Sequence, residues 1–343
     1  MADPPVHNDA PSLWPRIRAF FGQLFRRAPP QPGRFVSDST FAWKGWLAGS
    51  PWVWPRREYL VYVPAGYSRW RRRPLLVMLH GCRQTPEDFA AATRIAAMAD
   101  RKGWLVLLPR QTPKANPWTC WNWFDRGTVA GWGEAAIVAA QARAVRREYR
   151  ANPRQVFVAG LSAGAALAAV AGLRYRKLFA GVIAHSGIAC GAAPGPAAAM
   201  AAMAHGAGTA YERLAEQARL HAPPGSLPVA LLAIHGGEDG IVAAINSIQL
   251  VRQYLVLNDR LEAQDRPPAE LPMPDVERTQ GLREGRSMTV ADYRHNERLV
   301  ARCVRVPALG HAWSGGDAGF PYNDPLPPDA TALLGEFMDT VIR

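Results

Sequence analysis

The sequence lacks the cysteine spacing and the long apolar runs that would indicate a zinc-binding or membrane-spanning protein. Its four cysteines include no C-x-x-C pair, so no structural metal site is expected. They form two disulfides or remain free thiols, and the sequence leaves three complete pairings open. No uninterrupted apolar stretch approaches the roughly 18 residues that a membrane-spanning helix needs. The cysteines are Cys82, Cys120, Cys190 and Cys303.

Lysine is also scarce, and this scarcity bears on the meaning of the net charge of +12. Only four of the 40 basic residues are lysines. An arginine bias in a chain rich in alanine and proline raises the isoelectric point without any acidic partner. No recognised nucleic-acid-binding motif accompanies the charge, so no nucleic-acid partner is expected. With 48% apolar and 20% charged residues among 343, the chain can bury a sizeable core.

Residues 1–36 are predicted to be an N-terminal extension of a main domain that spans 37–343. Prolines flank the segment Ser12–Arg27, in which apolar residues recur at helical spacing among arginines. This pattern predicts a short basic amphipathic helix, which either contacts a membrane or hydrophobic granule or packs on the body of the protein. Arg16 and Arg18 interrupt the apolar stretch, so no clear signal peptide is present and a cytoplasmic location is favoured.

Strand and helix patterns alternate through the main domain, and this order predicts a mostly parallel sheet with helices on both faces. Tyr59–Val63 alternates in the manner of an antiparallel edge strand. Residues 259–286 carry many charges and four prolines, which indicates a surface insertion. Expected buried strands are Leu75–Leu79, Trp104–Leu108, Val156–Ala159, Gly181–Ala184, Val229–Ile234 and Leu299–Val306, and expected helices are 87–101, 133–149, 163–175, 243–257 and 329–342.

The sequence Gly160-Leu161-Ser162-Ala163-Gly164 is a G-x-S-x-G motif placed between a predicted strand and an alanine-rich helix. Such a junction holds a nucleophilic serine on a sharp, strained turn, and the flanking glycines permit close packing around it. The alternative is a buried turn serine. The context favours Ser162 as a catalytic nucleophile.

A serine nucleophile needs a base and an acid that orients the base, and α/β-hydrolases supply them in the chain order Ser, Asp or Glu, His. Asp239 follows the strand Val229–Ile234 and is the candidate acid, with Glu238 as the fallback. The alternative is that Asp239 only caps the following helix. His311 follows the last predicted strand and is the candidate base, because the other histidines lie in irregular or charged segments or precede the acid.

An oxyanion hole normally combines the N–H of the residue after the nucleophile with one from a loop after an earlier strand. Ala163 supplies the first. The strand Leu75–Leu79 leads into His80-Gly81-Cys82-Arg83-Gln84, where Cys82 is the candidate and Arg83 the weaker one. His80 is expected to brace this loop.

These residues resemble the polyhydroxybutyrate depolymerase family of esterases, which is related to feruloyl and acetylxylan esterases. The resemblance covers about residues 49–341 and implies an α/β-hydrolase fold and carboxylic-ester substrates. By this resemblance Asp239 takes the acid role. Secreted polymer degraders usually carry a signal peptide and a substrate-binding domain, so small or oligomeric esters are expected here. The blocks that carry the resemblance are residues 79–84, 120–124, 160–165, 185–188 and 311–316.

Aromatic residues near these motifs are candidate substrate-binding residues, namely Trp121, Trp123 and Trp313, because flat rings at a crevice rim bury acyl or aryl groups. Core packing is the equal alternative for the segment 118–124. Cys82 and Cys120 both follow strands at one edge of the predicted sheet, so a disulfide between them is a hypothesis, with free thiols as the alternative.

The sequence therefore predicts a serine carboxylic-ester hydrolase of the depolymerase type, acting on short hydroxyacid esters or oligomers through an acyl-enzyme. A feruloyl or acetylxylan-type esterase is the alternative within enzymes. A non-catalytic granule- or surface-binding protein on a hydrolase scaffold is the alternative outside them. No cofactor is expected, and the family resemblance leaves an extracellular location open.

Overall fold

The computed structural model describes residues 32–42, 56–208, 210–222 and 227–342. The chain divides into two units, Met1–Gln31 and Pro32–Arg343. The expected helix Ser12–Arg27 lies outside the described residues. The first strand of the second unit begins at Arg34, so residues 34–36, which the sequence assigned to the extension, belong to the sheet.

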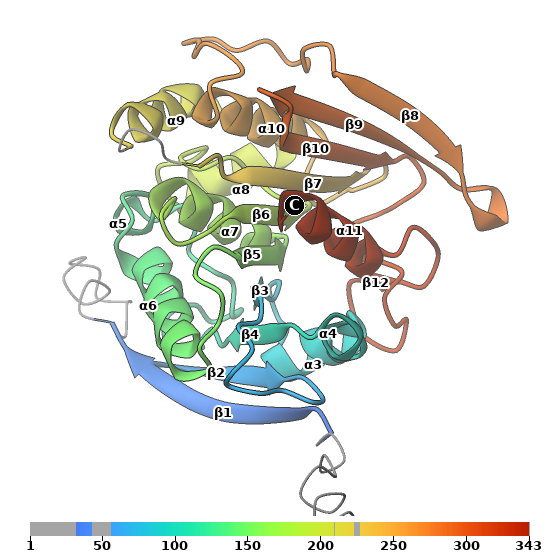
Figure 1. Ribbon diagram of the computed structural model, residues 1–343. Coiled ribbons are helices and arrows are strands. Elements are labelled where there is room, and N and C mark those ends of the chain that lie inside the picture. Colours follow the sequence, from blue (N-terminus) through green and yellow to red (C-terminus); the bar gives the residue numbers. More distant parts are fainter. Residues whose placement is uncertain (1–31, 43–55, 209, 223–226, 343) are drawn as a thin grey trace, which may run out of the picture. The chain divides into compact units, whose positions relative to one another are not determined.

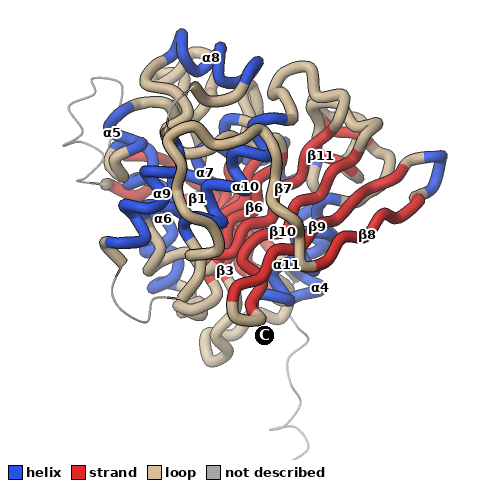
Figure 2. Tube along the Cα trace, turned by 90° about the horizontal axis from the view of Figure 1, so that it is seen from above, coloured by secondary structure: helices blue, strands red, loops and turns tan. Residues whose placement is uncertain are grey.

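Ten strands of the described residues form one sheet in the order β1-β2-β4-β3-β5-β6-β7-β10-β9-β8 (Figure 1). The run from β4 to β10 is parallel throughout. Antiparallel strands flank this run at both ends, and Figure 2 shows β10, β9 and β8 side by side at one of them. The bounds are β1 (Arg34–Phe41), β2 (Arg56–Val63), β3 (Leu75–Leu79), β4 (Leu105–Pro109), β5 (Val156–Leu161), β6 (Gly181–His185), β7 (Ala230–Gly236), β8 (Val276–Gly281), β9 (Ser287–His295) and β10 (Arg298–Val306).

Helices cover both faces of the sheet, as the alternating pattern predicts (Figure 1). One core lies between the sheet and α6, α7 and α10, and the other lies between the sheet and α3, α4 and α11. Neighbouring residues of β3, such as Leu76 and Val77, enter opposite cores, because side chains alternate along a strand. Burial on both faces explains the continuous apolar strands. The helices are α3 (Pro86–Ala92), α4 (Ile95–Lys102), α5 (Arg126–Val129), α6 (Gly133–Glu148), α7 (Ala163–Arg174), α8 (Pro196–His205), α9 (Tyr211–Leu220), α10 (Ile245–Leu257) and α11 (Ala330–Ile342).

Three expectations need correction. The helix predicted over 87–101 is two helices, because Arg94 has a left-handed backbone with φ of 53°. The strand β2 is antiparallel as expected, but β1 pairs with its outer side, so it does not lie at the edge. The predicted insertion 259–286 lies on the surface, yet its second half forms the exposed edge strand β8 and a 3₁₀ turn at Arg283–Gly285.

Two short strands, β11 (Trp313–Ser314) and β12 (Asn323–Asp324), pair in the segment that follows β10. None of the helices in the described part of the chain has the length and apolar character that crossing a bilayer requires.

Candidate active site

Ser162 occupies the turn between β5 and α7. Its φ of 57° and ψ of −120° place a non-glycine residue in a strained region of backbone space. A Cβ at Gly160 would lie 2.4 Å from the Gly164 carbonyl carbon, and one at Gly164 would lie 2.2 Å from the Leu79 carbonyl oxygen. Both glycines of the motif are therefore required by close backbone contacts.

Asp239 and His311 come together from segments 72 residues apart in the sequence. The Nδ1–H of His311 donates to both carboxylate oxygens of Asp239, at 2.9 and 2.8 Å. The loops after β7 and β10 pack so closely that a Cβ at Gly236 would lie 2.0 Å from the Leu309 carbonyl oxygen. A Cβ at Gly237 would lie 2.5 Å from the Pro307 carbonyl oxygen, so both glycines before Asp239 are required by close backbone contacts. With Nδ1 protonated, Nε2 of neutral His311 keeps the lone pair that a general base needs.

The surroundings of Asp239 favour its charged form. Burial raises the pKa of Asp239, but the hydrogen bond and charge of His311 and the Val242 N–H outweigh burial and hold this pKa below its usual value. The backbone N–H groups of Ile241 and Val242 donate to Oδ1 at 3.0 and 2.8 Å. The fallback Glu238 is exposed, so the geometry favours Asp239 as the acid partner of His311.

Ser162 and the Asp239–His311 pair lie at the same edge of the sheet, at the carboxyl ends of β5, β7 and β10. The backbone of His185, at the end of β6, lies between them. Its carbonyl accepts from the Ser162 N–H at 2.9 Å, and the pKa of its ring is lowered by burial and then by the charges of His235 and His311.

In the described part of the chain, the backbone N–H groups of both oxyanion-hole candidates, Ala163 and Cys82, are without a backbone acceptor. Ala163 is the first residue of α7, where a helix has no internal acceptor for the N–H. The N–H of Cys82 has no acceptor among the described residues. Its neighbour Arg83 donates to the Trp118 carbonyl at 2.8 Å, and Gly81 donates to Gln84 Oε1 at 2.8 Å. Of the two candidates that the sequence offers in this loop, Cys82 is the one with a free donor.

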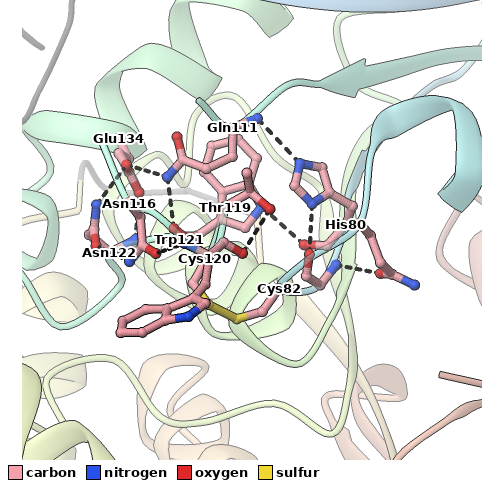
Figure 3. The surroundings of a disulfide bond; sticks show 12 residues. His80, Cys82, Gln111, Asn116, Thr119, Cys120, Trp121, Asn122 and Glu134 are labelled. Carbon is pink, nitrogen blue, oxygen red and sulfur yellow. Dashed lines mark hydrogen bonds between the residues drawn. A yellow bond between two sulfur atoms is a disulfide. The ribbon is translucent and has the colours of Figure 1, made fainter. Parts of the chain in front are cut away.

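Cys82 forms a disulfide with Cys120 (Figure 3), which confirms the pairing hypothesis. Cys190 and Cys303 are free and buried. His80 lies beside the disulfide: its Nδ1–H donates to the Gly81 carbonyl at 2.8 Å, and its Nε2 accepts from the Gln111 N–H at 3.2 Å. The ring is therefore neutral, and burial lowers its pKa to about 4. His80 braces the loop, as expected.

The three tryptophans proposed to bind substrate are core residues in this structure. Their exposed fractions are 1% for Trp121, 3% for Trp123 and 0% for Trp313. Trp121 donates to the His80 carbonyl at 3.0 Å, and Trp313 donates to Thr331 Oγ1 at 3.1 Å. Of the two alternatives for the segment 118–124, core packing is correct for Trp121 and Trp123. Trp118, in the same segment, is 60% exposed.

Sequence reasoning missed several polar residues around these groups. Ser186 is buried beside Asp239 and its hydroxyl contributes to the lowered pKa of that carboxyl. His235 lies with Nε2 3.7 Å from Asp239 Oδ2. Glu134 is buried next to the disulfide loop. The signals for Ser186 were its place two residues after the predicted strand Gly181–Ala184 and its position in the block 185–188 that carries the family resemblance. Within the described residues, no cluster of side chains is arranged to hold a metal ion.

Comparison with known proteins places these features in a family. The family model described as "Esterase PHB depolymerase" matches residues 57–270. Poly(3-hydroxyalkanoate) depolymerase C of Paucimonas lemoignei is 30% identical over 195 residues, which cover 56% of this chain and 46% of that protein. Probable acetylxylan esterase A of Aspergillus clavatus is 27% identical over 133 residues, 38% of this chain and 42% of that protein. The chain thus matches less than half of the length of each of these two relatives.

The structure is similar to that of an acetyl xylan esterase from Aspergillus awamori. The TM-score is 0.61 at 18% identity, over 80% of this chain and 94% of that one. At this identity the likeness concerns the fold, which is that of the α/β-hydrolases. The family model spans more than half of the residues of this chain, so the chain belongs to the Esterase PHB depolymerase family.

Proposed function

We propose that this protein is a serine carboxylic-ester hydrolase that acts through an acyl-enzyme, with Ser162 as nucleophile, His311 as base and Asp239 as the orienting acid. The observation that carries the proposal is the hydrogen-bonded Asp239–His311 pair at the sheet edge where Ser162 occupies a strained turn. Family membership supports the same class of reaction.

In the acylation step, Ser162 Oγ attacks the ester carbonyl carbon while His311 Nε2 accepts the hydroxyl proton. The imidazolium that forms is stabilised by the Asp239 carboxylate through the Nδ1 hydrogen bond. Negative charge develops on the carbonyl oxygen, and the free N–H groups of Cys82 and Ala163 stabilise it. Collapse of the tetrahedral intermediate expels the alcohol, which takes the proton from His311.

In the deacylation step, water attacks the acyl-enzyme carbonyl carbon and His311 accepts a proton from it. The same two N–H groups bind the second oxyanion. Its collapse breaks the bond to Ser162 Oγ, which recovers its proton from His311, and the carboxylic acid leaves. One constellation of residues thus serves both halves of the reaction.

The test is hydrolysis of a p-nitrophenyl ester by the Ser162→Ala variant beside Ser37→Ala on the distant edge strand β1. Removal of the nucleophile should lower kcat by about 10⁴-fold or more, with unchanged thermal unfolding, while Ser37→Ala should match the wild type. Equal turnover by the Ser162→Ala variant would reject the assignment.

For the substrate we propose esters or oligomers of short hydroxyacids, supported by the name of the Paucimonas lemoignei relative. An acetylxylan- or feruloyl-type esterase is the second candidate, supported by the acetylxylan esterase relatives. Initial rates on hydroxybutyrate oligomers, acetylated xylan and feruloyl esters separate the candidates, because the acyl groups differ in size and aromatic character. The expected contact of Ser12–Arg27 with a membrane or hydrophobic granule stays a prediction.

A further inference from the structure

Glu134 is a buried carboxylate that takes no part in the proposed reaction. It lies in the first turn of α6 and is 1% exposed. Burying a charge is costly unless hydrogen bonds and opposite charge compensate. The contacts of Glu134 therefore indicate what this charge does.

Among the described residues, each hydrogen-bond partner of the Glu134 carboxylate is an N–H donor. Oε1 accepts from Gln111 Nε2 at 2.6 Å and from Asn122 Nδ2 at 3.1 Å, and Oε2 accepts from the Asn122 N–H at 2.6 Å. The Arg57 guanidinium lies 3.7 Å away. The pKa of Glu134 lies above its usual value, because burial outweighs the hydrogen bonds and the charge of Arg57, which act in the opposite direction. An environment made of donors matches an ionised carboxylate that only accepts.

Through these donors, Glu134 holds the segment 118–122 that carries Cys120 (Figure 3). Asn122 is bound through both its backbone and its side chain. Gln111, bound to Glu134 by its Nε2, donates from the same atom to the Cys120 carbonyl at 2.9 Å. The carboxylate is thus the shared acceptor of the groups that fix this segment.

The same segment is attached at three points to the loop of residues 80–84, the oxyanion loop, which follows β3. The Trp121 indole donates to the His80 carbonyl at 3.0 Å, the disulfide joins Cys120 to Cys82, and the Arg83 N–H donates to the Trp118 carbonyl at 2.8 Å. These attachments lie before, at and after Cys82. They fix the peptide whose N–H is left free.

We propose that the Glu134 carboxylate is a positioning residue for the oxyanion hole, acting through the segment 118–122 on the Cys82 N–H. The inference rests on the proposed esterase function. A preorganised donor stabilises a developing oxyanion because it needs no reorganisation during the reaction. A small displacement of the donor therefore affects the transition state more than the bound ester.

The experiment compares Glu134→Gln with Glu212→Gln in the full, disulfide-intact chain. Glu212 is a matched control, since it is also buried and bound to an arginine, Arg252, at 2.8 Å, but it lies in α9. In Glu134→Gln one acceptor oxygen becomes an NH₂ group that faces donors. Measurements are kcat and KM for p-nitrophenyl butyrate, the inhibition constants of a butylboronic acid and of butyrate, and the melting temperature.

Glu134→Gln should lower kcat by about tenfold and weaken boronate binding by the same factor, with KM and butyrate inhibition within about twofold of the wild type. The boronate adduct with Ser162 places an oxygen in the oxyanion hole, whereas butyrate reports ground-state binding. Glu212→Gln should leave these kinetic values unchanged even where it lowers the melting temperature. Should Glu134→Gln fail to fold, Gln111→Met removes the link to Cys120 and should show the same selective loss.

The inference is overturned if Glu134→Gln keeps wild-type kcat and boronate affinity, or if both glutamate variants lose activity in proportion to their melting temperatures. A wild-type protein that neither hydrolyses the ester nor binds the boronate would overturn the proposed function as well. If the wild type is active and the Glu134→Gln variant keeps its kcat and boronate affinity, only the positioning role of Glu134 is overturned.

Discussion

Asp239 and Glu238 are adjacent carboxylates in different environments. Asp239 is buried and accepts from His311 and from two backbone N–H groups, whereas Glu238 is exposed. The donors around Asp239 keep its pKa low despite burial, so the carboxylate stays charged while it orients His311. One step along the chain thus separates the carboxylate that we propose as the orienting acid from a solvated side chain.

The variant Asp239→Asn should lower kcat by about 10⁴-fold. An amide that turns its NH₂ toward the His311 ring favours the tautomer with the proton on Nε2. In this tautomer Nε2 has no lone pair to accept the Ser162 proton. The measurement is ester hydrolysis at neutral pH, with Glu238→Gln as the neighbouring control that should keep wild-type kcat. A larger loss in Glu238→Gln than in Asp239→Asn would transfer the acid role to Glu238.

Side chains whose roles follow from chain order were predictable, and those whose roles depend on burial were not. The order Ser162, Asp239, His311 is a property of the sequence, and it identified the pair that the structure brings together. Trp121 and Trp123 were equally compatible with a rim or a core until the fold fixed their exposure. Glu134 carried no motif, because its partners come from three separate segments.

At the scale of elements, the first turn of α7 packs directly against the backbone at the end of β3. A Cβ at Gly164, in the first turn of α7, would meet the Leu79 carbonyl oxygen at 2.2 Å and the His80 carbonyl oxygen at 2.6 Å. Both atoms are backbone, so they cannot move aside as a flexible side chain would. The glycine lets the helix begin directly against the strand that leads to the oxyanion loop.

Gly164→Ala should therefore destabilise the protein by about 3 kcal/mol or more, because overpacking against backbone forces the helix away from the sheet. The measurement is urea unfolding followed by circular dichroism. Gly281→Ala is the control, since a Cβ there meets no atom within 4 Å, and it should change stability by less than about 0.5 kcal/mol. Equal stability of the two variants would show that α7 can shift freely.

The elements found from the sequence are those with a strong apolar signal. The strands of the parallel run were predicted to within a few residues, since burial on both faces makes each a continuous apolar stretch. The edge strand β8 has six exposed residues, so no alternation marks it. The break between α3 and α4 depends on the left-handed backbone of Arg94, which helical periodicity does not reveal.

At the scale of the whole molecule, parallel strands bring distant segments to one edge. The loops after β3, β5, β7 and β10 carry Cys82, Ser162, Asp239 and His311. The carboxyl ends of parallel strands meet at the same side of a sheet. These loops therefore converge although they are far apart in the sequence. The packing of these loops at the carboxyl edge of the sheet also buries histidines that form hydrogen bonds in their neutral form.

Three buried histidines make the folded protein sensitive to acid. Burial lowers the pKa of His80 to about 4, burial and the charges of His235 and His311 lower that of His185 to about 3, and burial lowers that of His235. In the unfolded chain a histidine has a pKa of about 6.5. Between about pH 6.5 and 4 the unfolded state therefore binds protons that the folded state does not.

Stability should consequently be fully present above about pH 6.5 and fall as the pH drops toward 4, by about 1.4 kcal/mol per pH unit for each buried neutral histidine. Replacing His80 by Gln removes one such group and should reduce the slope of unfolding free energy near pH 5 by about that amount. Urea unfolding at pH 5, 6 and 7 measures the slope, and His205→Gln, an exposed histidine, should leave it unchanged. An unaltered slope in His80→Gln would mean that His80 becomes protonated in the folded protein, against the acceptor role of its Nε2 toward the Gln111 N–H.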